Sequence, residues 1–130
     1  MNDEELLSIA REEIKQSYAP YSKYYVGAAL ESSEGTIFTG CNIENANYSN
    51  SIHAEELAIA KAVQEGYRSF ERIAVSSDRR DGVTPCGMCR QSLSEFCESD
   101  LRIICEGAHG PVTYTLGELL PNTITGEHLE

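Results

Sequence analysis

The sequence has no long hydrophobic segment. Its longest uncharged apolar run, 24–30, has seven residues, whereas a membrane-spanning helix needs about 20. The first twenty residues carry five acidic side chains, and no basic stretch precedes an apolar core as it would in a secretory signal. We therefore expect a protein without a membrane partner that stays in the cytoplasm.

Basic residues are also scarce. Ten Lys and Arg stand against 21 Asp and Glu, which gives a net charge of −11. The basic residues are scattered, and only Arg79 and Arg80 are adjacent. A field of this sign repels phosphate backbones, so we expect no nucleic-acid partner.

Tryptophan is absent, and the five cysteines form an odd, dispersed set. A disulfide framework is not expected in a reducing compartment. Cys41, Cys97 and Cys105 have apolar neighbours, and we expect them to pack as small hydrophobic residues. Cys86 and Cys89 differ, because their C-x-x-C spacing is typical of metal or redox sites.

The remaining composition is that of an ordinary folded chain. Of the 130 residues 41% are hydrophobic and 24% are charged, and we find no internal repeat, linker or low-complexity segment. This length fits one domain, which we expect to span residues 1–130.

Hydrophobic spacing predicts four helices and five strands. The first helix has Asp3 as its N-cap and ends before Pro20, and Gly66 ends the second. A capping box, Thr115-x-x-Glu118, opens the last. The predicted helices cover 3–18, 54–65, 86–97 and a short segment after Thr115; the predicted strands cover 24–30, 36–41, 72–76, 101–105 and 112–115.

This order of elements predicts an α/β fold. A hairpin formed by 24–30 and 36–41 precedes strand–helix–strand units, which gives one mixed five-stranded sheet with helices on both faces. We therefore expect a three-layer α/β/α sandwich.

Candidate metal ligands stand at the starts of two predicted helices. His53 precedes the helix 54–65, and Cys86 and Cys89 open the helix 86–97. A histidine and two cysteines supply three of the four ligands of a tetrahedral zinc, and catalytic zinc sites leave the fourth place to water. Glu55 lies two residues after His53, about 200° around a helix, so it suits a proton carrier better than a fourth ligand.

Other interpretations of these residues remain open at this point. A structural zinc site needs a fourth protein ligand, and neither His109 nor His128 lies at a suitable spacing. A thioredoxin-type dithiol has no histidine–glutamate partner, and here no tryptophan lies beside the pair. A non-catalytic, zinc-stabilised binding module leaves Glu55 without a role.

The chain resembles the small homotetrameric cytidine deaminases over nearly its whole length. The spacing H-x-E with a later P-C-x-x-C is the zinc deaminase signature, and the resemblance also rests on the motifs at 18–24, 26–30, 40–46, 85–91 and 118–121. It implies a cytidine deaminase-like fold with one Zn²⁺ per chain, ligated by His53, Cys86 and Cys89, with Glu55 as the catalytic acid and base. The implied reaction is the hydrolysis of cytidine and 2′-deoxycytidine to uridine and 2′-deoxyuridine plus ammonia, in pyrimidine salvage by a homotetramer.

The same resemblance implies how a nucleoside substrate is held. Asn42 and Glu44 take the positions that bind the sugar 3′-hydroxyl, and Tyr24 takes that of an aromatic residue stacked on the pyrimidine. Tyr48 lines the pocket, and the backbone of Ala54 contacts the base. A related possibility is a deaminase of a modified aminopyrimidine nucleoside or nucleoside antibiotic, which need not keep the contacts of Asn42 and Glu44 with the sugar.

Two positions depart from the small-chain pattern. Those enzymes have Cys-Ala-Glu-Arg where this sequence has His53-Ala-Glu-Glu56, and the His-Ala-Glu pattern is that of the larger dimeric enzymes. A neutral imidazole in place of a thiolate removes one negative charge, so Glu56 in place of the arginine is compatible with function. The tail has Ile124 where the resemblance implies an aromatic residue for a neighbouring subunit's pocket.

Overall fold

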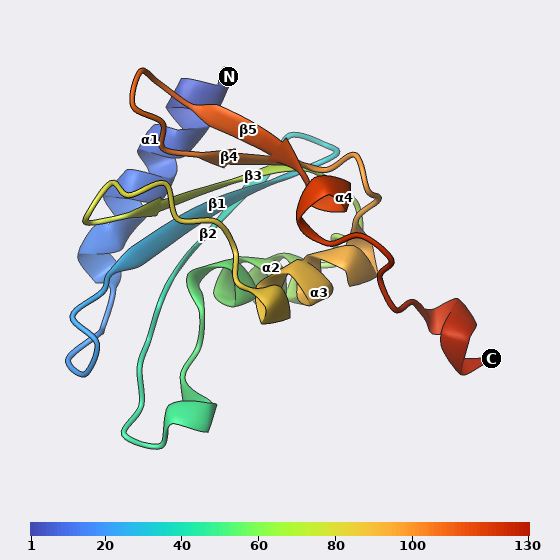
Figure 1. The fold of residues 1–130 in the computed structure, drawn as a ribbon, viewed down its shortest axis with the longest axis horizontal. Helices are drawn as coiled ribbons and strands as arrows, with labels where there is room; N and C mark the ends of the chain where they lie inside the picture. Colours follow the sequence, from blue (N-terminus) through green and yellow to red (C-terminus); the bar gives the residue numbers. More distant parts are fainter.

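The computed structural model describes residues 1–130 and builds them around one five-stranded sheet (Figure 1). Its strands are β1 Val26–Ser32, β2 Ile37–Cys41, β3 Phe70–Ser77, β4 Arg102–Cys105 and β5 Val112–Thr115. They lie in the order β2-β1-β3-β4-β5, with β3 and β4 parallel and all other neighbours antiparallel. The predicted mixed five-stranded sheet is confirmed.

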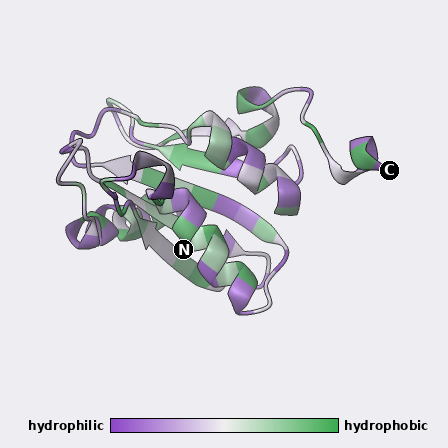
Figure 2. Cartoon of the chain, turned by 90° about the horizontal axis from the view of Figure 1, so that it is seen from below, coloured by the Kyte–Doolittle hydropathy of each residue, from purple (hydrophilic) through white to green (hydrophobic).

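Helices cover both faces of the sheet. The α-helices are α1 Asp3–Glu13, α2 Ala54–Gln64, α3 Gly87–Phe96 and α4 Leu116–Leu119; short 3₁₀ turns cover Ile14–Gln16, Tyr48–Asn50 and Gly126–Leu129. Each longer helix carries both hydrophobic and hydrophilic residues in Figure 2, as expected for helices with one buried and one exposed side. No helix has the length and apolar character needed to cross a membrane.

The hydrophobic core consists of two clusters, because side chains alternate between the two faces of the sheet along each strand. Leu30 and Ile73 belong to the larger cluster, which includes side chains of α2 and α3. Ala29 and Ala74, one residue away on the same strands, belong to the smaller cluster formed with α1. Because successive strand residues point to opposite faces, the sheet lies between α1 and the α2–α3 layer, which confirms the three-layer α/β/α sandwich.

Two glycines let the helices approach the sheet closely. A Cβ atom at Gly27 of β1 would lie 2.0 Å from the carbonyl oxygen of Ala10 in α1. A Cβ atom at Gly40 of β2 would lie 2.1 Å from the carbonyl oxygen of Ala54, the first residue of α2. Each glycine therefore permits a helix–sheet contact that no side chain would allow.

An ion pair joins α1 to the end of β4. The guanidinium of Arg11 donates two hydrogen bonds of 2.7 Å to Glu106, and Ser76 donates a third of 2.8 Å. The hydrogen bond from Arg11 and its charge hold the pKa of Glu106 below its usual range, despite partial burial. Glu106 therefore ties the N-terminal helix to the centre of the sheet.

The first helix differs from the prediction at both ends. Its N-cap is Asn2 rather than Asp3, because Asn2 and Glu5 form a capping box in which Glu5 N–H donates to Asn2 over 2.8 Å. The α-helix ends at Glu13 rather than at residue 18. Tyr18 lies instead in an isolated bridge with Ile43 and donates its N–H to the Asn42 carbonyl.

Other boundaries shift by one or two residues. The predicted strand 24–30 is observed as Val26–Ser32, because Lys23 adopts a φ of 60° and Tyr24 N–H bonds to the Ser22 hydroxyl instead of a strand. Gly66, with a φ of 96°, follows the end of α2 as predicted. The capping box of Thr115 and Glu118 at α4 is also confirmed.

All five cysteines are free. Cys41 and Cys105 are buried and Cys97 is half-buried, in agreement with their predicted packing role. Burial raises the pKa of Cys97 and of Cys105 to about 12. Burial also raises the pKa of Cys41, so all three thiols stay protonated at neutral pH.

Candidate active site

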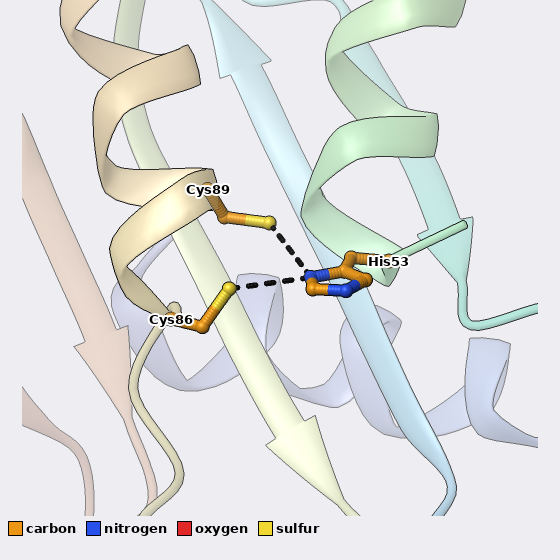
Figure 3. Close-up of side chains that lie close together, drawn as sticks. All are labelled: His53, Cys86 and Cys89. Carbon is orange, nitrogen blue, oxygen red and sulfur yellow. Dashed lines mark hydrogen bonds between the residues drawn. The ribbon is translucent and has the colours of Figure 1, made fainter. Parts of the chain in front are cut away.

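His53, Cys86 and Cys89 come together at the adjacent starts of α2 and α3 (Figure 3). His53 is the N-cap of α2 and Cys86 is the N-cap of α3, while Cys89 lies in the first turn of α3. Nδ1 of His53 lies 3.2 Å from Sγ of Cys86 and 3.4 Å from Sγ of Cys89. The structure thus unites the three predicted metal ligands, although 33 residues separate His53 from Cys86.

The donor set fits a zinc ion. One ligand atom from each residue lies within 4.8 Å of the other two. Bond lengths of about 2.3 Å to sulfur and 2.0–2.1 Å to nitrogen place such atoms about 3.5 Å apart around a tetrahedral ion, close to the distances observed. Three donors leave one position free, as in catalytic rather than structural zinc sites.

The surroundings of the Cys89 sulfur favour a neutral thiol. Burial raises the pKa of the Cys89 thiol, and the nearby Glu55 carboxylate raises it further. A dication between the sulfurs favours the thiolate form instead. The helix N-termini that carry Cys86 and His53 add unpaired N–H groups and the positive end of each helix dipole.

Glu56 has a role that the sequence interpretation missed. Its Oε1 accepts a hydrogen bond of 3.0 Å from the backbone N–H of His53, which caps the first turn of α2. A glutamate three residues after an N-cap is a recognisable signal for this arrangement. At the position where the resemblance implies an arginine, this chain therefore has a residue that fixes the backbone of a predicted metal ligand.

Glu55 is buried beside the cluster, with only 5% of its surface exposed. Burial raises the pKa of its carboxyl group above the usual range. Such a group takes up and releases a proton more readily near neutral pH than an exposed glutamate does. Its place in the first turn of α2 brings it to the same cavity as His53 and Cys86.

That cavity has a volume of about 530 Å³. Eight of the nine predicted site residues line it, namely Tyr24, Asn42, Glu44, Tyr48, His53, Ala54, Glu55 and Cys86. Cys89 is fully buried and does not line the cavity. Residues that the sequence interpretation did not assign also line the cavity: Tyr21, Ser22, Val26, Ser51, Ile52, Val83 and Thr84.

Residues 1–105 match the family model described as "Cytidine and deoxycytidylate deaminase zinc-binding region". This chain belongs to that family. The match contains all three residues of the metal-ligand cluster and Glu55, and it makes the protein a hydrolytic deaminase.

Known proteins resemble this deaminase over most of its length. It is 42% identical over 130 residues to a cytidine deaminase of Sporosarcina psychrophila, covering 99% of this chain and 96% of that protein. It is 34% identical over 127 residues to a blasticidin-S deaminase of Bacillus cereus, covering 92% and 89%. A crystal structure of cytidine deaminase from Burkholderia pseudomallei superposes with a TM-score of 0.89 at 35% identity, over 95% of this chain and 100% of that one.

Asn42 lines the deaminase cavity, and its side-chain amide bonds to the backbone of Tyr24 and of Val26, the first residue of β1. Its Oδ1 accepts from Val26 N–H over 2.9 Å, and its Nδ2 donates to the Tyr24 carbonyl over 2.7 Å. An amide group has two hydrogens and two acceptor lone pairs. One hydrogen and one lone pair therefore remain for a ligand.

Glu44 is held as a carboxylate at the cavity edge. Its Oε1 accepts from the N–H groups of Tyr21 and Ser22, each over 3.0 Å, and its Oε2 accepts from the Ser22 hydroxyl. These bonds, that from the Ser22 hydroxyl above all, lower the pKa of Glu44. The carboxylate is therefore ionised and fixed in orientation.

Tyr48 and Ile124 are both exposed. Tyr48 is 75% exposed and packs edge-on against Tyr21, with ring centroids 6.2 Å apart. Ile124 is 55% exposed, does not line the cavity of its own chain, and accepts a hydrogen bond from Gln91 at its carbonyl. The tail that carries Ile124 extends away from the sheet in both views (Figure 1, Figure 2).

Proposed function

We propose that this deaminase catalyses the zinc-dependent hydrolysis of cytidine and 2′-deoxycytidine to uridine and 2′-deoxyuridine plus ammonia. One observation carries the proposal: His53 and Cys86 of the histidine–cysteine–cysteine cluster and the buried Glu55 line one cavity of about 530 Å³. A binding module needs no such carboxylate, whereas hydrolysis of an amidine needs a group that moves protons.

One zinc ion per chain is held by His53, Cys86 and Cys89. When bound there, zinc supplies Lewis-acid activation of water, so that a hydroxide nucleophile is available at neutral pH. His53 and Cys86 are fixed for this task as helix N-caps, and the N–H bond to Glu56 sets the backbone of His53.

Glu55 is the proton carrier. Its carboxylate takes a proton from the attacking water and delivers it to N3 of the pyrimidine ring, which makes C4 electrophilic. It then takes the proton of the new hydroxyl group on C4 and passes it to the amino group, so that the C4–N bond breaks, ammonia leaves and C4 becomes a carbonyl. Its raised pKa suits both steps, because the group must exchange its proton in both directions at working pH.

The rest of the cavity holds the nucleoside. Asn42 and Glu44 bind the sugar 3′-hydroxyl, using the spare amide groups of Asn42 and the fixed carboxylate of Glu44. Tyr24 stacks on the pyrimidine, and the backbone of Ala54 contacts the base. Tyr48 lines the same pocket.

In the cell we place this activity in cytoplasmic pyrimidine salvage. Five free cysteines, two of them proposed metal ligands, suit a reducing compartment. Residues 1–130 act as one deaminase domain, and four copies form a homotetramer. The tail supports this proposal, because Ile124 is an apolar side chain that is 55% exposed and available for contact with a neighbouring copy.

The test follows the ultraviolet absorbance of cytidine with the purified protein and measures zinc in the same sample. We expect loss of the cytosine band and about one zinc per chain, with loss of both activity and zinc on chelation. Glu55→Ala keeps zinc and lowers kcat by about 10²–10⁴-fold, because no other group carries the proton. Glu65→Ala, at the exposed C-terminal end of the same helix, is the matched control and keeps both.

Each other outcome has a defined meaning. Near-normal turnover of Glu55→Ala contradicts its assignment. Zinc without turnover of any aminopyrimidine nucleoside makes the protein a binding module. Absence of zinc favours the alternative that Cys86 and Cys89 form a redox pair.

A second candidate activity is deamination of a nucleoside antibiotic. The 34% identity to a blasticidin-S deaminase over 92% of this chain favours it. Comparing kcat/KM for cytidine, deoxycytidine and blasticidin S on one preparation shows which activity is the main one. The variant Glu44→Gln provides a second test, of whether the substrate is held by its sugar. A nucleoside held by its 3′-hydroxyl loses affinity in this variant, whereas a substrate without that contact does not.

A further inference from the structure

The hydroxyl group of Tyr24 is bound to a carboxylate far away in the sequence. It donates to Asp81, with distances of 2.8 and 3.0 Å to the two carboxylate oxygens. Asp81 lies in the loop between β3 and α3, five residues before Cys86. The hydrogen bond therefore joins the segment before β1 to the loop that delivers a metal ligand.

Asp81 is itself anchored to the sheet. Ser77, the last residue of β3 and fully buried, donates its hydroxyl to Oδ1 of Asp81 over 2.8 Å. Partial burial alone would raise the pKa of Asp81, but the hydrogen bonds from Ser77 and Tyr24 outweigh it and lower the pKa. Asp81 is therefore a fixed, ionised acceptor.

The ring and backbone of Tyr24 are also restrained. The guanidinium of Arg79 lies over one face of the ring, 5.1 Å from its centroid, in a cation–π contact. The Tyr24 N–H donates to the Ser22 hydroxyl, and its carbonyl accepts from Asn42. Because Arg79 covers one face, only the other face of the ring is left for stacking.

We propose that Asp81 is a positioning residue for the substrate: it fixes the ring of Tyr24, whose face opposite Arg79 then meets the pyrimidine. The inference rests on the proposed function, in which Tyr24 stacks on the base. A phenylalanine could supply the same stacking surface but has no hydroxyl by which Asp81 could hold it. Affinity for the base therefore depends on a carboxylate that does not touch it.

A double-mutant cycle tests the proposal, using Tyr24→Phe, Asp81→Ala and the two combined. Tyr24→Phe removes one oxygen atom and keeps the ring. We expect each single variant to raise KM for cytidine about three- to tenfold while kcat changes less, because each change removes about the net free energy of one typical hydrogen bond from binding. The double variant should raise KM no more than the single variant with the larger effect does, because both changes remove the same interaction.

Asp78→Asn is the matched control in the same loop. Asp78 accepts from the backbone N–H of Tyr25 over 3.2 Å, and asparagine keeps that oxygen while it removes the same charge. It leaves KM and kcat near the values of the unchanged protein. A fall in kcat at unchanged KM for Asp81→Ala, or additive effects in the double variant, overturns the proposal.

A second readout does not depend on turnover. The ultraviolet difference between a protein and its Tyr24→Phe counterpart reports ionisation of the Tyr24 phenol alone. Burial raises the pKa of this phenol, and the Asp81 carboxylate also acts to raise it. We expect the phenol to titrate at lower pH in Asp81→Ala, whereas an unchanged titration overturns the link. If no nucleoside is deaminated yet the titration shifts as expected, the proposed function fails while the contact between Asp81 and Tyr24 stands.

Discussion

Replacing Gly40 by alanine tests whether the packing of α2 on the sheet sets the position of the reacting groups. The new Cβ would lie 2.1 Å from the Ala54 carbonyl oxygen and 2.8 Å from the Ala58 nitrogen. Real Cβ atoms essentially never approach another heavy atom within 3.0 Å, so the start of α2 must move by about 1 Å. Ala54 stands between His53 and Glu55, and both move with it.

A displacement of about 1 Å can lower the rate about 10²-fold when it affects reacting groups. We expect Gly40→Ala to lower kcat/KM by about one to two orders of magnitude and to weaken zinc binding. Overpacking also lowers the free energy of unfolding, by about 1–3 kcal/mol. The activity loss must therefore be separated from the loss of stability.

Gly27→Ala provides that separation. Its Cβ would lie 2.0 Å from the Ala10 carbonyl oxygen, a clash of the same size on the opposite face of the sheet. The helix that it displaces, α1, contributes no residue to the cavity. Urea denaturation should show similar destabilisation of both variants, while zinc content and kcat/KM fall only in Gly40→Ala. Equal activity losses per folded molecule would refute the reasoning.

Two further predictions concern charge. His53→Cys should keep zinc but lose activity, because a third thiolate adds a negative charge at the site. Adding Glu56→Arg should restore part of kcat/KM. A double variant with no higher kcat/KM than His53→Cys alone contradicts this explanation. Glu106→Gln should make unfolding less sensitive to acid. Arg11 holds the Glu106 pKa low, so the stability contributed by this ion pair is present at neutral pH and lost as pH falls through that lowered pKa. Urea unfolding from about pH 7 to pH 3 measures it, and identical pH dependence of the two proteins would show that Glu106 does not contribute.

The layer order of the fold was predictable because local signals agreed with it. Gly66 ends α2, and Thr115 caps α4, at the positions where turn and cap residues appear in the sequence. The ends of helices and strands that depend on contacts with distant segments were not predictable. Tyr18 continues the helical spacing of α1, yet it leaves the helix to bond with Asn42 and Glu44, 24 and 26 residues further on.

The candidate site shows the same division. His53, Cys86 and Cys89 were found because their spacing at helix starts is itself a chemical pattern. Asp81 was missed, because it lies 57 residues from Tyr24 and no local pattern marks the pair. The cap from Glu56 had a signal, a glutamate three residues after the N-cap, but His53 in place of serine or threonine concealed it.

The proposed metal ligands lie far apart along the chain. A bound ion would therefore affect the unfolded state as well as the chemistry of the site. An ion that joins His53 to Cys86 closes a loop of 33 residues, which contains α2 and the central strand β3. By analogy with a covalent cross-link, a loop of this length removes about 3–4 kcal/mol of chain entropy from the unfolded ensemble. An ion bound by the proposed ligands would act as a reversible cross-link, so the concentration of free metal would affect the free energy of unfolding as well as the activity.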